Sequence, residues 1–334
     1  MLFQNAELFN VEELVPTPHG LRISRLPAHV REKMNNIVQT ASAFAADGVE
    51  IRFVLQGPTA TIRFNLPNGK ANDLIPVILY FGNIQGGWLP WLTMKTLHPG
   101  LNELVIERPQ YEDRFPEHAA TYNHPFAPCV VRVRLCSSCQ YLLGIEGDIR
   151  PPKAEELPKL HGICYGSSIT HGSLGILPNQ MYVALCADAL RADIRNLGFA
   201  GSCFLENAMG DYFAEQENLD FLCIELGTNL FGWFPEDQFV ERVTYILDRF
   251  RETHPTTPII LIDILTVKPR DERCRTVVRE LAAARNDPNL LALCGRDLLE
   301  NEDSVSADFI HPTMEGQRKI AQNLAPAIQK MLNR

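Results

Sequence analysis

The sequence predicts an α/β protein in two parts: an N-terminal all-β sandwich of jelly-roll type, followed by a three-layer α/β/α domain with a parallel sheet. Two observations support this prediction. In the first half, short segments alternate apolar and charged residues and are separated by turns; in the second half, apolar runs alternate with segments of helical spacing. A length of 334 residues is sufficient for two domains with separate cores.

Five segments of the first half are predicted strands. In 49–54 (VEIRFV) and 59–66 (TATIRFNL), apolar residues alternate with polar ones, and Asn68-Gly69 supplies a turn after the second segment. The remaining predicted strands are 77–81, 101–107 and 130–135. Short strands with turns between them and few helical periods are typical of β-sandwiches.

A change of composition separates the two halves. Residues 147–158 (GDIRPPKAEELP) contain three prolines and five charged residues, a composition typical of a linker. We therefore expect a β-sandwich domain at 1–150, a linker at 151–158 and an α/β domain at 159–334.

The second half alternates predicted strands and helices. The predicted strands are 160–165, 193–197, 221–226, 258–265 and 289–294. The predicted helices are 179–190, 235–253, 270–285 and 313–332. This alternation indicates a parallel sheet covered on both faces. In such sheets ligands bind beyond the carboxyl ends of the strands, so the loops after the strands are where functional residues are expected.

Charge and composition exclude several classes of partner. The formal net charge is −9, and the sequence has no basic stripe, so we expect neither nucleic acid nor an anionic membrane surface as a partner. The longest uncharged stretch, 160–187, contains glycines and a proline that argue against a membrane-spanning helix. The beginning of the chain lacks a basic segment followed by an apolar run, which predicts no signal peptide and a cytoplasmic location. Nine scattered cysteines indicate reduced thiols.

Four short motifs lie at or beside the predicted strand ends. Ser168 lies in GSSIT after the first strand of the second half, Gly201 in FAGS after the next, and Asn229 in GTN after the third. Asp308 and His311 lie in DFIHP, just before the last predicted helix. Each motif alone could be an ordinary turn. Together they supply a serine nucleophile, a base, an acid that orients the base, and donors for an oxyanion.

The ordered set of motifs resembles the SGNH, or GDSL, hydrolase family. GSSIT matches the first block of the family, with Ser168 at the position of the nucleophile; Gly201 matches the glycine block, Asn229 the Gly-x-Asn block, and Asp308 and His311 the Asp-x-x-His block. The resemblance spans about residue 158 to the C-terminus. The first half is similar to the β-sandwich that precedes this domain in some carbohydrate esterases of the family.

The sequence departs from the family pattern at two positions. Ser167 stands where an Asp commonly precedes the nucleophile, and Leu230 stands where an acidic residue often follows Gly-x-Asn. Neither departure removes a member of the triad.

The resemblance implies a mechanism. Ser168 would attack an acyl carbonyl, His311 would act as the base and then as the acid, and Asp308 would orient His311. The backbone N–H groups of Ser168 and Gly201, with the side chain of Asn229, would form the oxyanion hole. This scheme requires no metal and no organic cofactor.

Several further residues have two interpretations. His171 either contacts the substrate or packs as a loop residue on the N-terminal domain, and Trp233 forms either a pocket wall or part of the core. Trp88 and Trp91 could stack on a sugar ring or be buried in the sandwich. Cys136 and Cys139 have the spacing of metal ligands, but no second cysteine pair completes a zinc site.

The main functional prediction is a serine esterase that removes short acyl groups, acetyl above all, from a carbohydrate or another small alcohol. Two alternatives remain open: a lipase or thioesterase for longer acyl chains, and a catalytically silent carbohydrate-binding protein. The sequence is compatible with a homo-oligomer.

Overall fold

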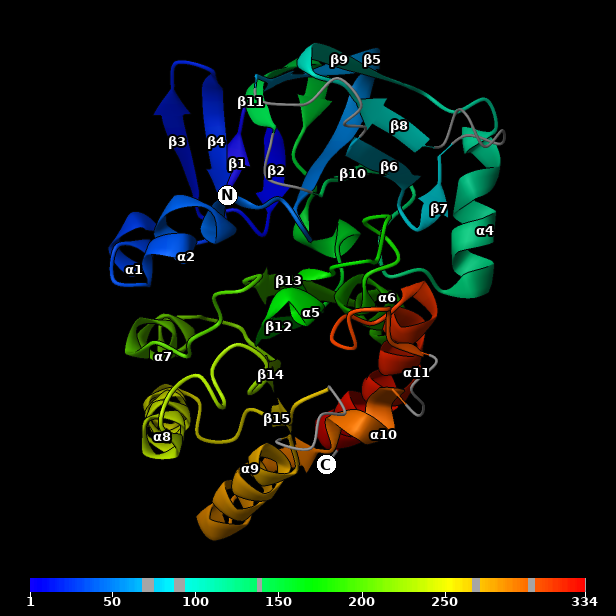
Figure 1. The fold of residues 1–334 in the computed structure, drawn as a ribbon. Coiled ribbons are helices and arrows are strands. Elements are labelled where there is room, and N and C mark those ends of the chain that lie inside the picture. The colour runs from blue at the N-terminus through cyan, green and yellow to red at the C-terminus, as the bar shows by residue number, and fades with distance from the viewer. Residues whose placement is uncertain (68–74, 87–93, 137–139, 266–270, 300–303, 334) are drawn as a thin grey trace. The chain divides into compact units, whose positions relative to one another are not determined.

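The computed structural model describes residues 1–67, 75–86, 94–136, 140–265, 271–299 and 304–333. They form two compact units, whose elements are labelled in Figure 1. The first unit comprises residues 1–27, 43–159 and 177–179, and the second comprises 28–42, 160–176 and 180–334. The first unit contains an antiparallel sheet and the second a parallel sheet, as the sequence predicts.

The first unit is built around the long strand β5 (Glu50–Leu66). In its described part, eleven antiparallel strands are connected along the path β3-β4-β11-β5-β10-β6-β7, with β2 and β9 also paired with β5, β1 with β2, and β8 with β6. The other strands are β1 (Leu2–Phe3), β2 (Ala6–Phe9), β3 (Glu13–Thr17), β4 (Gly20–Ser24), β6 (Ile75–Phe81), β7 (Ile84–Gln85), β8 (Met94–Leu97), β9 (Gly100–Glu107), β10 (Val130–Arg134) and β11 (Tyr141–Arg150). One helix, α4 (Phe115–Tyr122), and the 3₁₀ turns Glu112–Arg114 and Ala154–Glu156 also belong to this unit, and the 3₁₀ turn Ser42–Phe44 lies at its boundary with the segment 28–42.

The two strands predicted at 49–54 and 59–66 are one continuous strand, so the predicted break between them is wrong. The pairing shows why: Leu55 pairs with Ile149 of β11, whereas Ala60 pairs with Gly147, so β5 has extra residues at this point. Such a bulge leaves groups outside the ladder and tolerates a proline. Arg108 supports the bulge, because its guanidinium donates a hydrogen bond to the Leu55 carbonyl at 2.9 Å.

The composition of 147–158 is misleading at its first residues. Residues 147–150 belong to β11 and pair with β5. Beyond them, Glu156 in the short 3₁₀ turn forms an ion pair with Arg150 at 2.6 Å, and its carbonyl accepts a hydrogen bond from Ala127 at 2.9 Å. This segment is therefore fastened to the first unit despite its prolines and charges.

The second unit has the parallel strand order β13-β12-β14-β15-β16. The strands are β12 (Leu160–Gly166), β13 (Ala192–Gly198), β14 (Phe221–Glu225), β15 (Ile259–Ile262) and β16 (Leu290–Leu293). The helices between and after them are α5 (Ser168–His171), α6 (Tyr182–Leu190), α7 (Asn207–Ala214), α8 (Glu236–Thr253), α9 (Asp271–Arg285), α10 (Gly295–Leu299) and α11 (Met314–Leu332). All five predicted strands are present. The helix predicted at 179–190 begins later, at Tyr182, and α7 is an addition to the prediction.

Helices cover both faces of the parallel sheet, which gives the predicted three layers. On one face, Cys164 of β12 and Cys223 of β14 belong to a buried cluster with residues of α6, α10 and α11, such as Ile320. The next residue of β12, Tyr165, points to the other face, where its ring centroid lies 5.4 Å from that of Phe213 in α7. This alternation is the two-residue period of a strand buried on both sides. Among the described helices, none has both the length and the apolar character needed to cross a membrane.

Two short segments belong to a different unit from their sequence neighbours. Residues 28–42, with α1 (Ala28–Arg31) and α2 (Asn36–Thr40), are part of the second unit. Asn35 caps α2 and donates to the Ser202 carbonyl at 2.9 Å and to Glu206 Oε1 at 2.5 Å. Conversely, residues 177–179 are part of the first unit, where Asn179 Nδ2 donates to the Tyr80 hydroxyl at 2.9 Å. The late start of α6 follows from this second placement.

Candidate active site

The loop after β12 presents Ser168 at the carboxyl edge of the sheet. β12 lies between β13 and β14, so the chain leaves it at the point where the strand order reverses, which is where ligands bind in open α/β sheets. Ser167 is the N-cap of the one-turn helix α5, and its Oγ accepts a hydrogen bond from the Ile169 N–H at 3.2 Å. Ser168 is the first residue of this helix and is 7% exposed.

Two glycines allow α5 to pack closely against the strand ends. A methyl group on Gly166 would lie 2.2 Å from Thr170 Oγ1, and one on Gly198 would lie 2.0 Å from the backbone nitrogen of His171. Real Cβ atoms do not approach other atoms this closely, so a glycine is required at both positions. The absence of these two side chains fixes the position of α5 and, through it, of Ser168.

Ser168, His311 and Asp308 form one chain of hydrogen bonds. His311 Nε2 lies 2.7 Å from Ser168 Oγ, and His311 Nδ1 lies 2.6 Å from Asp308 Oδ2. Because an ionised carboxylate only accepts hydrogen bonds, Nδ1 carries the proton, and Nε2 is left to accept the proton of the serine hydroxyl. These are the hydrogen bonds expected of a serine nucleophile, its base and the acid that orients the base.

The loop around Asp308 holds its carboxylate in place. While Oδ2 faces the imidazole, Oδ1 accepts hydrogen bonds from Ser306 Oγ at 2.7 Å and from the backbone N–H groups of Ile310 and His311 at 2.9 Å each. The hydrogen bond from the His311 side chain, followed by those from the backbone, lowers the pKa of Asp308 well below its usual range. Asp308 is therefore ionised at neutral pH.

The residues expected in the oxyanion hole lie in loops after the three neighbouring strands. Ser168 follows the central strand β12, Gly201 follows β13 and Asn229 follows β14. Asn229 Oδ1 accepts a hydrogen bond from the Cys203 N–H at 3.3 Å, which joins the second loop to the third and leaves the Nδ2 group of Asn229 as the donor. Gly201 has the left-handed φ of +65° that glycine adopts without strain.

The sequence analysis missed Glu225, the last residue of β14. Its side chain is 1% exposed and accepts three hydrogen bonds: from the Ser167 N–H at 2.6 Å, from Thr170 Oγ1 at 3.2 Å and from Thr228 Oγ1 at 2.6 Å. It therefore joins the loop that bears Ser168 to the GTN loop. The signal available in the sequence was a single carboxylate at the end of the otherwise apolar run FLCIEL.

The two residues expected to contact substrate differ in their surroundings. His171 ends α5, and its Nδ1 lies 3.2 Å from the Gly198 carbonyl, so the ring is held against the end of β13. Trp233, in the loop after β14, is 74% exposed and is not a core residue. Ser167 and Leu230, at the two departures from the family pattern, are buried.

The remaining candidates are the tryptophans considered for sugar stacking and the cysteine pair considered for metal binding. Trp88, Trp91 and Cys139 lie outside the described residues. Within the described ranges, no group of three or more His, Cys, Asp and Glu side chains is placed to hold a metal ion.

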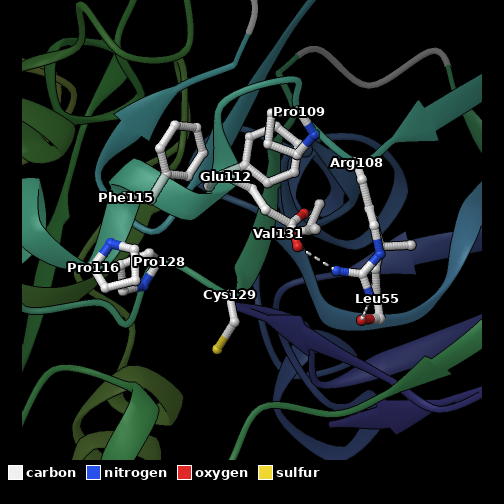
Figure 2. A pocket seen from close by; sticks show the side chains of 10 residues that line it. Leu55, Arg108, Pro109, Glu112, Phe115, Pro116, Pro128, Cys129 and Val131 are labelled. Carbon is white, nitrogen blue, oxygen red and sulfur yellow. Dashed lines mark hydrogen bonds and ion pairs between the residues drawn. The ribbon is translucent and has the colours of Figure 1, made fainter.

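A separate pocket of about 190 Å³ lies in the first unit (Figure 2). Its walls are mainly apolar, formed by Leu55, Phe81, Pro109, Phe115, Pro116, Pro128 and Val131 with Arg108, Glu112 and Cys129. The guanidinium of Arg108 donates to Glu112 Oε1 at 2.6 Å and to the Leu55 carbonyl at 2.9 Å, so its donors are engaged by the protein itself. The pocket contains no set of groups suited to catalysis.

A serine, a histidine and an aspartate in one hydrogen-bonded chain at the edge of a parallel α/β/α sheet form the arrangement that is typical of serine hydrolases. Residues 161–329 match the GDSL-like lipase/acylhydrolase family, and the chain belongs to this family. It is an ester hydrolase of the SGNH/GDSL type. A search of curated proteins gave no match.

Solved structures with the same fold extend over both units. They include a salicylyl-acyltransferase, SsfX3, from a tetracycline biosynthetic pathway, at 17% identity over 98% of this chain and 95% of that one, with a TM-score of 0.78. A structure described as a GDSL-like lipase from Bacteroides ovatus has 17% identity, covering 99% of this chain and 96% of that one, with a TM-score of 0.71. A family two carbohydrate esterase from Clostridium thermocellum, solved with cellohexaose, has 16% identity over 85% and 92%, with a TM-score of 0.60.

Proposed function

We propose that this protein is a serine esterase that hydrolyses short-chain acyl esters, acetyl esters above all, of a carbohydrate or another small alcohol. The single observation that supports this proposal most strongly is the hydrogen-bonded chain from Ser168 Oγ through His311 to Asp308, at 2.7 Å and 2.6 Å.

The acylation half of the reaction uses all three residues. Ser168 Oγ attacks the acyl carbonyl while His311 Nε2 removes the hydroxyl proton. Asp308 keeps the proton on Nδ1 and stabilises the imidazolium that forms. His311 then gives its Nε2 proton to the leaving alkoxide, and the acyl group remains on Ser168. Water, activated by the same histidine, releases the acid.

The negative charge of the tetrahedral intermediate requires donors that are already oriented. We assign this role to the backbone N–H groups of Ser168 and Gly201 and to the Nδ2 group of Asn229. The hydrogen bond from Cys203 to Asn229 Oδ1 supports this assignment, because it orients the amide before the substrate arrives.

The nature of the substrate is supported by chemistry and by the structural neighbours. An ester is cleaved more readily than an amide, because an alkoxide is the better leaving group. The carbohydrate part of the proposal is supported by the carbohydrate esterases that share the fold over 85% or more of this chain.

The decisive experiment is the hydrolysis of p-nitrophenyl acetate by the wild type and by Ser168→Ala, with circular dichroism of both. We expect turnover by the wild type and its loss in a folded Ser168→Ala. Equal activity of the two proteins would indicate a different nucleophile. If neither protein hydrolyses acetyl or longer acyl esters but both bind sugars, the protein is a carbohydrate-binding protein instead.

The same assay distinguishes two alternative reactions, the hydrolysis of longer acyl esters and acyl transfer. Rates that rise from acetyl to octanoyl esters would favour a lipase or thioesterase. The likeness to the salicylyl-acyltransferase over 98% of the chain favours a test of acyl transfer as well. An added alcohol that increases p-nitrophenol release and appears as a new ester would identify a transferase, since it would intercept the same acyl-enzyme.

A further inference from the structure

Phe309 occupies the loop that carries Asp308 and His311, and its side chain is 63% exposed. The loop is a tight one: the Ser306 N–H donates to the His311 carbonyl at 2.8 Å, and the Phe309 N–H donates to the Ser306 carbonyl at 2.9 Å. Phe309 has a left-handed φ of +56°, which turns the chain back toward this closure. The exposed aromatic side chain is therefore carried on a hydrogen-bonded loop, two residues before His311 in the sequence.

A phenylalanine is an unfavourable residue for this position in the free protein. A left-handed backbone costs most residues stability relative to glycine, and it is uncommon for bulky side chains. Exposure of most of the ring means that burial offsets little of this cost. Strained residues of this kind occur preferentially at functional sites. The contribution of the ring must therefore be sought in the complex with a ligand.

The position of His311 indicates which part of the substrate the ring can reach. His311 must donate its Nε2 proton to the leaving oxygen, so the alcohol portion of the ester lies on the His311 side of Ser168. Two residues span at most about 7 Å of chain, so the Cα atom of Phe309 lies no farther than this from that of His311. An aromatic ring at that distance can contact the carbon atoms attached to the leaving oxygen.

We propose that Phe309 is a specificity-determining residue that contacts the alcohol portion of the ester and selects alcohols with an apolar face. The inference rests on the proposed function, since it requires His311 to protonate the leaving group. The proposal specifies the class of alcohol in the ester. This alcohol is an aryl alcohol or one with a contiguous hydrocarbon surface, rather than one that is polar on all sides. The acyl group is on the other side of the carbonyl and is not selected by Phe309.

The test uses two acetates whose leaving groups have similar acidity but different polarity, benzyl acetate, whose alcohol has an aromatic face, and 2-hydroxyethyl acetate, whose alcohol has none. We expect the wild type to prefer the first. In Phe309→Gly, kcat/KM for the first should fall about tenfold, the effect of one lost aromatic contact. The value for the second should change little, and the ratio of p-nitrophenyl acetate to p-nitrophenyl butyrate hydrolysis should stay as in the wild type. Phe309→Tyr should retain the preference.

Two further variants separate the ring from the backbone. Phe309→Asn places a polar side chain in a residue type that tolerates the left-handed conformation, and it should lose the preference as Phe309→Gly does. Ile176→Gly is the matched control, because Ile176 is also left-handed (φ +57°) and 67% exposed but lies in a different loop. Both glycine variants should keep or raise the unfolding midpoint, whereas only Phe309→Gly should change the leaving-group preference.

Several outcomes would overturn the proposal: no preference in the wild type, an unchanged preference in Phe309→Gly, an equal loss in Ile176→Gly, or a changed acetate-to-butyrate ratio. Failure of the proposed function is distinguishable, since it appears as full activity in Ser168→Ala. Calorimetric titration with benzyl alcohol gives a readout independent of turnover. Its affinity should be about tenfold weaker for Phe309→Gly than for the wild type, and equal affinities would again contradict the proposal.

Discussion

The carboxylate of Asp308 has two separable tasks, because its two oxygens face different partners. Oδ2 faces the imidazole of His311, whereas Oδ1 accepts the N–H groups of Ile310 and His311 and the hydroxyl of Ser306. We therefore expect one oxygen to orient the base, while the other closes the loop. An asparagine can perform the second task and not the first.

We expect Asp308→Asn to stay folded and to lose activity severely. Its amide oxygen can take the place of Oδ1, but its NH₂ group would then face Nδ1 and force the proton onto Nε2, the wrong tautomer for a base. A loss of about 10³- to 10⁴-fold in kcat is the usual consequence. The measurement is kcat for p-nitrophenyl acetate together with near-ultraviolet circular dichroism. Ser306→Ala is the control, since it removes one bond to Oδ1 and should cost much less activity. Near-normal turnover by Asp308→Asn would exclude an orienting role.

Asn229 is expected to act on the transition state and to contribute little to the fold. Removing one donor from an oxyanion hole lowers kcat by about 10² to 10³. We therefore expect Asn229→Ala to remain folded, with KM nearly unchanged and kcat reduced by this factor. The loss of the bond to Cys203 adds a small cost in stability, which urea unfolding would measure. If Asn229→Ala turned over at a normal rate, the third donor would have to be another group.

We expect Glu225 to be a positioning residue that acts through the geometry of the two loops it joins. Glu225→Ala would leave the buried Ser167 N–H without an acceptor, at a cost of about 1 to 3 kcal/mol, whereas the Thr170 hydroxyl keeps the Tyr182 hydroxyl as a partner at 2.8 Å. In Glu225→Gln, the amide oxygen can accept both bonds and the NH₂ group can donate to Thr228. We expect Gln to retain most of the wild-type kcat and Ala to lose it, with KM changing less than kcat. If the charge of Glu225 stabilised the imidazolium instead, Gln and Ala would be equally impaired, and the pH profile of kcat would shift in both.

At the scale of elements, the position of α5 depends on contacts that only glycine permits. We expect Gly198→Ala to destabilise the protein by about 2 to 3 kcal/mol and to lower kcat, because its methyl group meets the backbone of His171, which cannot move without moving Ser168. Gly201→Ala is a matched control: it has a left-handed φ but no atom within 4 Å of the added methyl group, so it should cost only about 1 kcal/mol. Urea unfolding of both variants makes the comparison. Equal costs for the two would show that the close approach at Gly198 is not tight.

The elements of the second unit were the most predictable from the sequence. Each of its strands is a short apolar run, and α8 begins one residue after the predicted start at 235 and ends where predicted. Hydrophobic periodicity predicts such elements well, because burial on one or both faces of an element creates the pattern of apolar residues. The short N-terminal strands β1 to β4 and strand β11 were not predicted. β1 to β4 have only two to five residues each, too few for a clear period, and β11 pairs mainly with β5, which is distant in the sequence.

Part of the candidate site was predictable, because its residues lie in short local motifs. Ser168, Asn229, Asp308 and His311 lie in loops whose short motifs are visible in the sequence, and the structure places three of the four in one local network. Glu225 was not predictable, because its role depends on a contact with Ser167 that is 58 residues away in the sequence. A charged residue at the end of an apolar strand has no sequence feature that reveals its partners.

At the scale of the whole molecule, the two units do not correspond to two continuous pieces of chain. Residues 28–42 form part of the second unit although they precede the strand β5 of the first. A boundary placed only near residue 150 therefore misses this segment. Composition could not reveal it, because Asn35 and its partner Glu206 are separated by 171 residues.

This arrangement predicts the behaviour of a cleaved protein. If a protease site is introduced into 151–158 and cut under native conditions, residues 28–42 should remain packed in the second unit. The two fragments should therefore elute together in size-exclusion chromatography and keep their esterase activity. They should separate only in denaturant. A native separation into two fragments would show that the packing of 28–42 contributes little. Asn35→Ala, which removes the side-chain bonds to Ser202 and Glu206 and keeps the backbone bond to Glu206, should make the cleaved protein dissociate at a lower urea concentration than the cleaved wild type.

The placement of residues 28–42 also determines the order of events during synthesis. The segment leaves the ribosome long before Ser202 and Glu206 have been translated, and the delay for 171 residues is roughly 10 to 35 s at ordinary elongation rates. During this time the residues of the second unit that bind Asn35 have not been made. A segment that is made early is thus expected to be among the last to reach its final position.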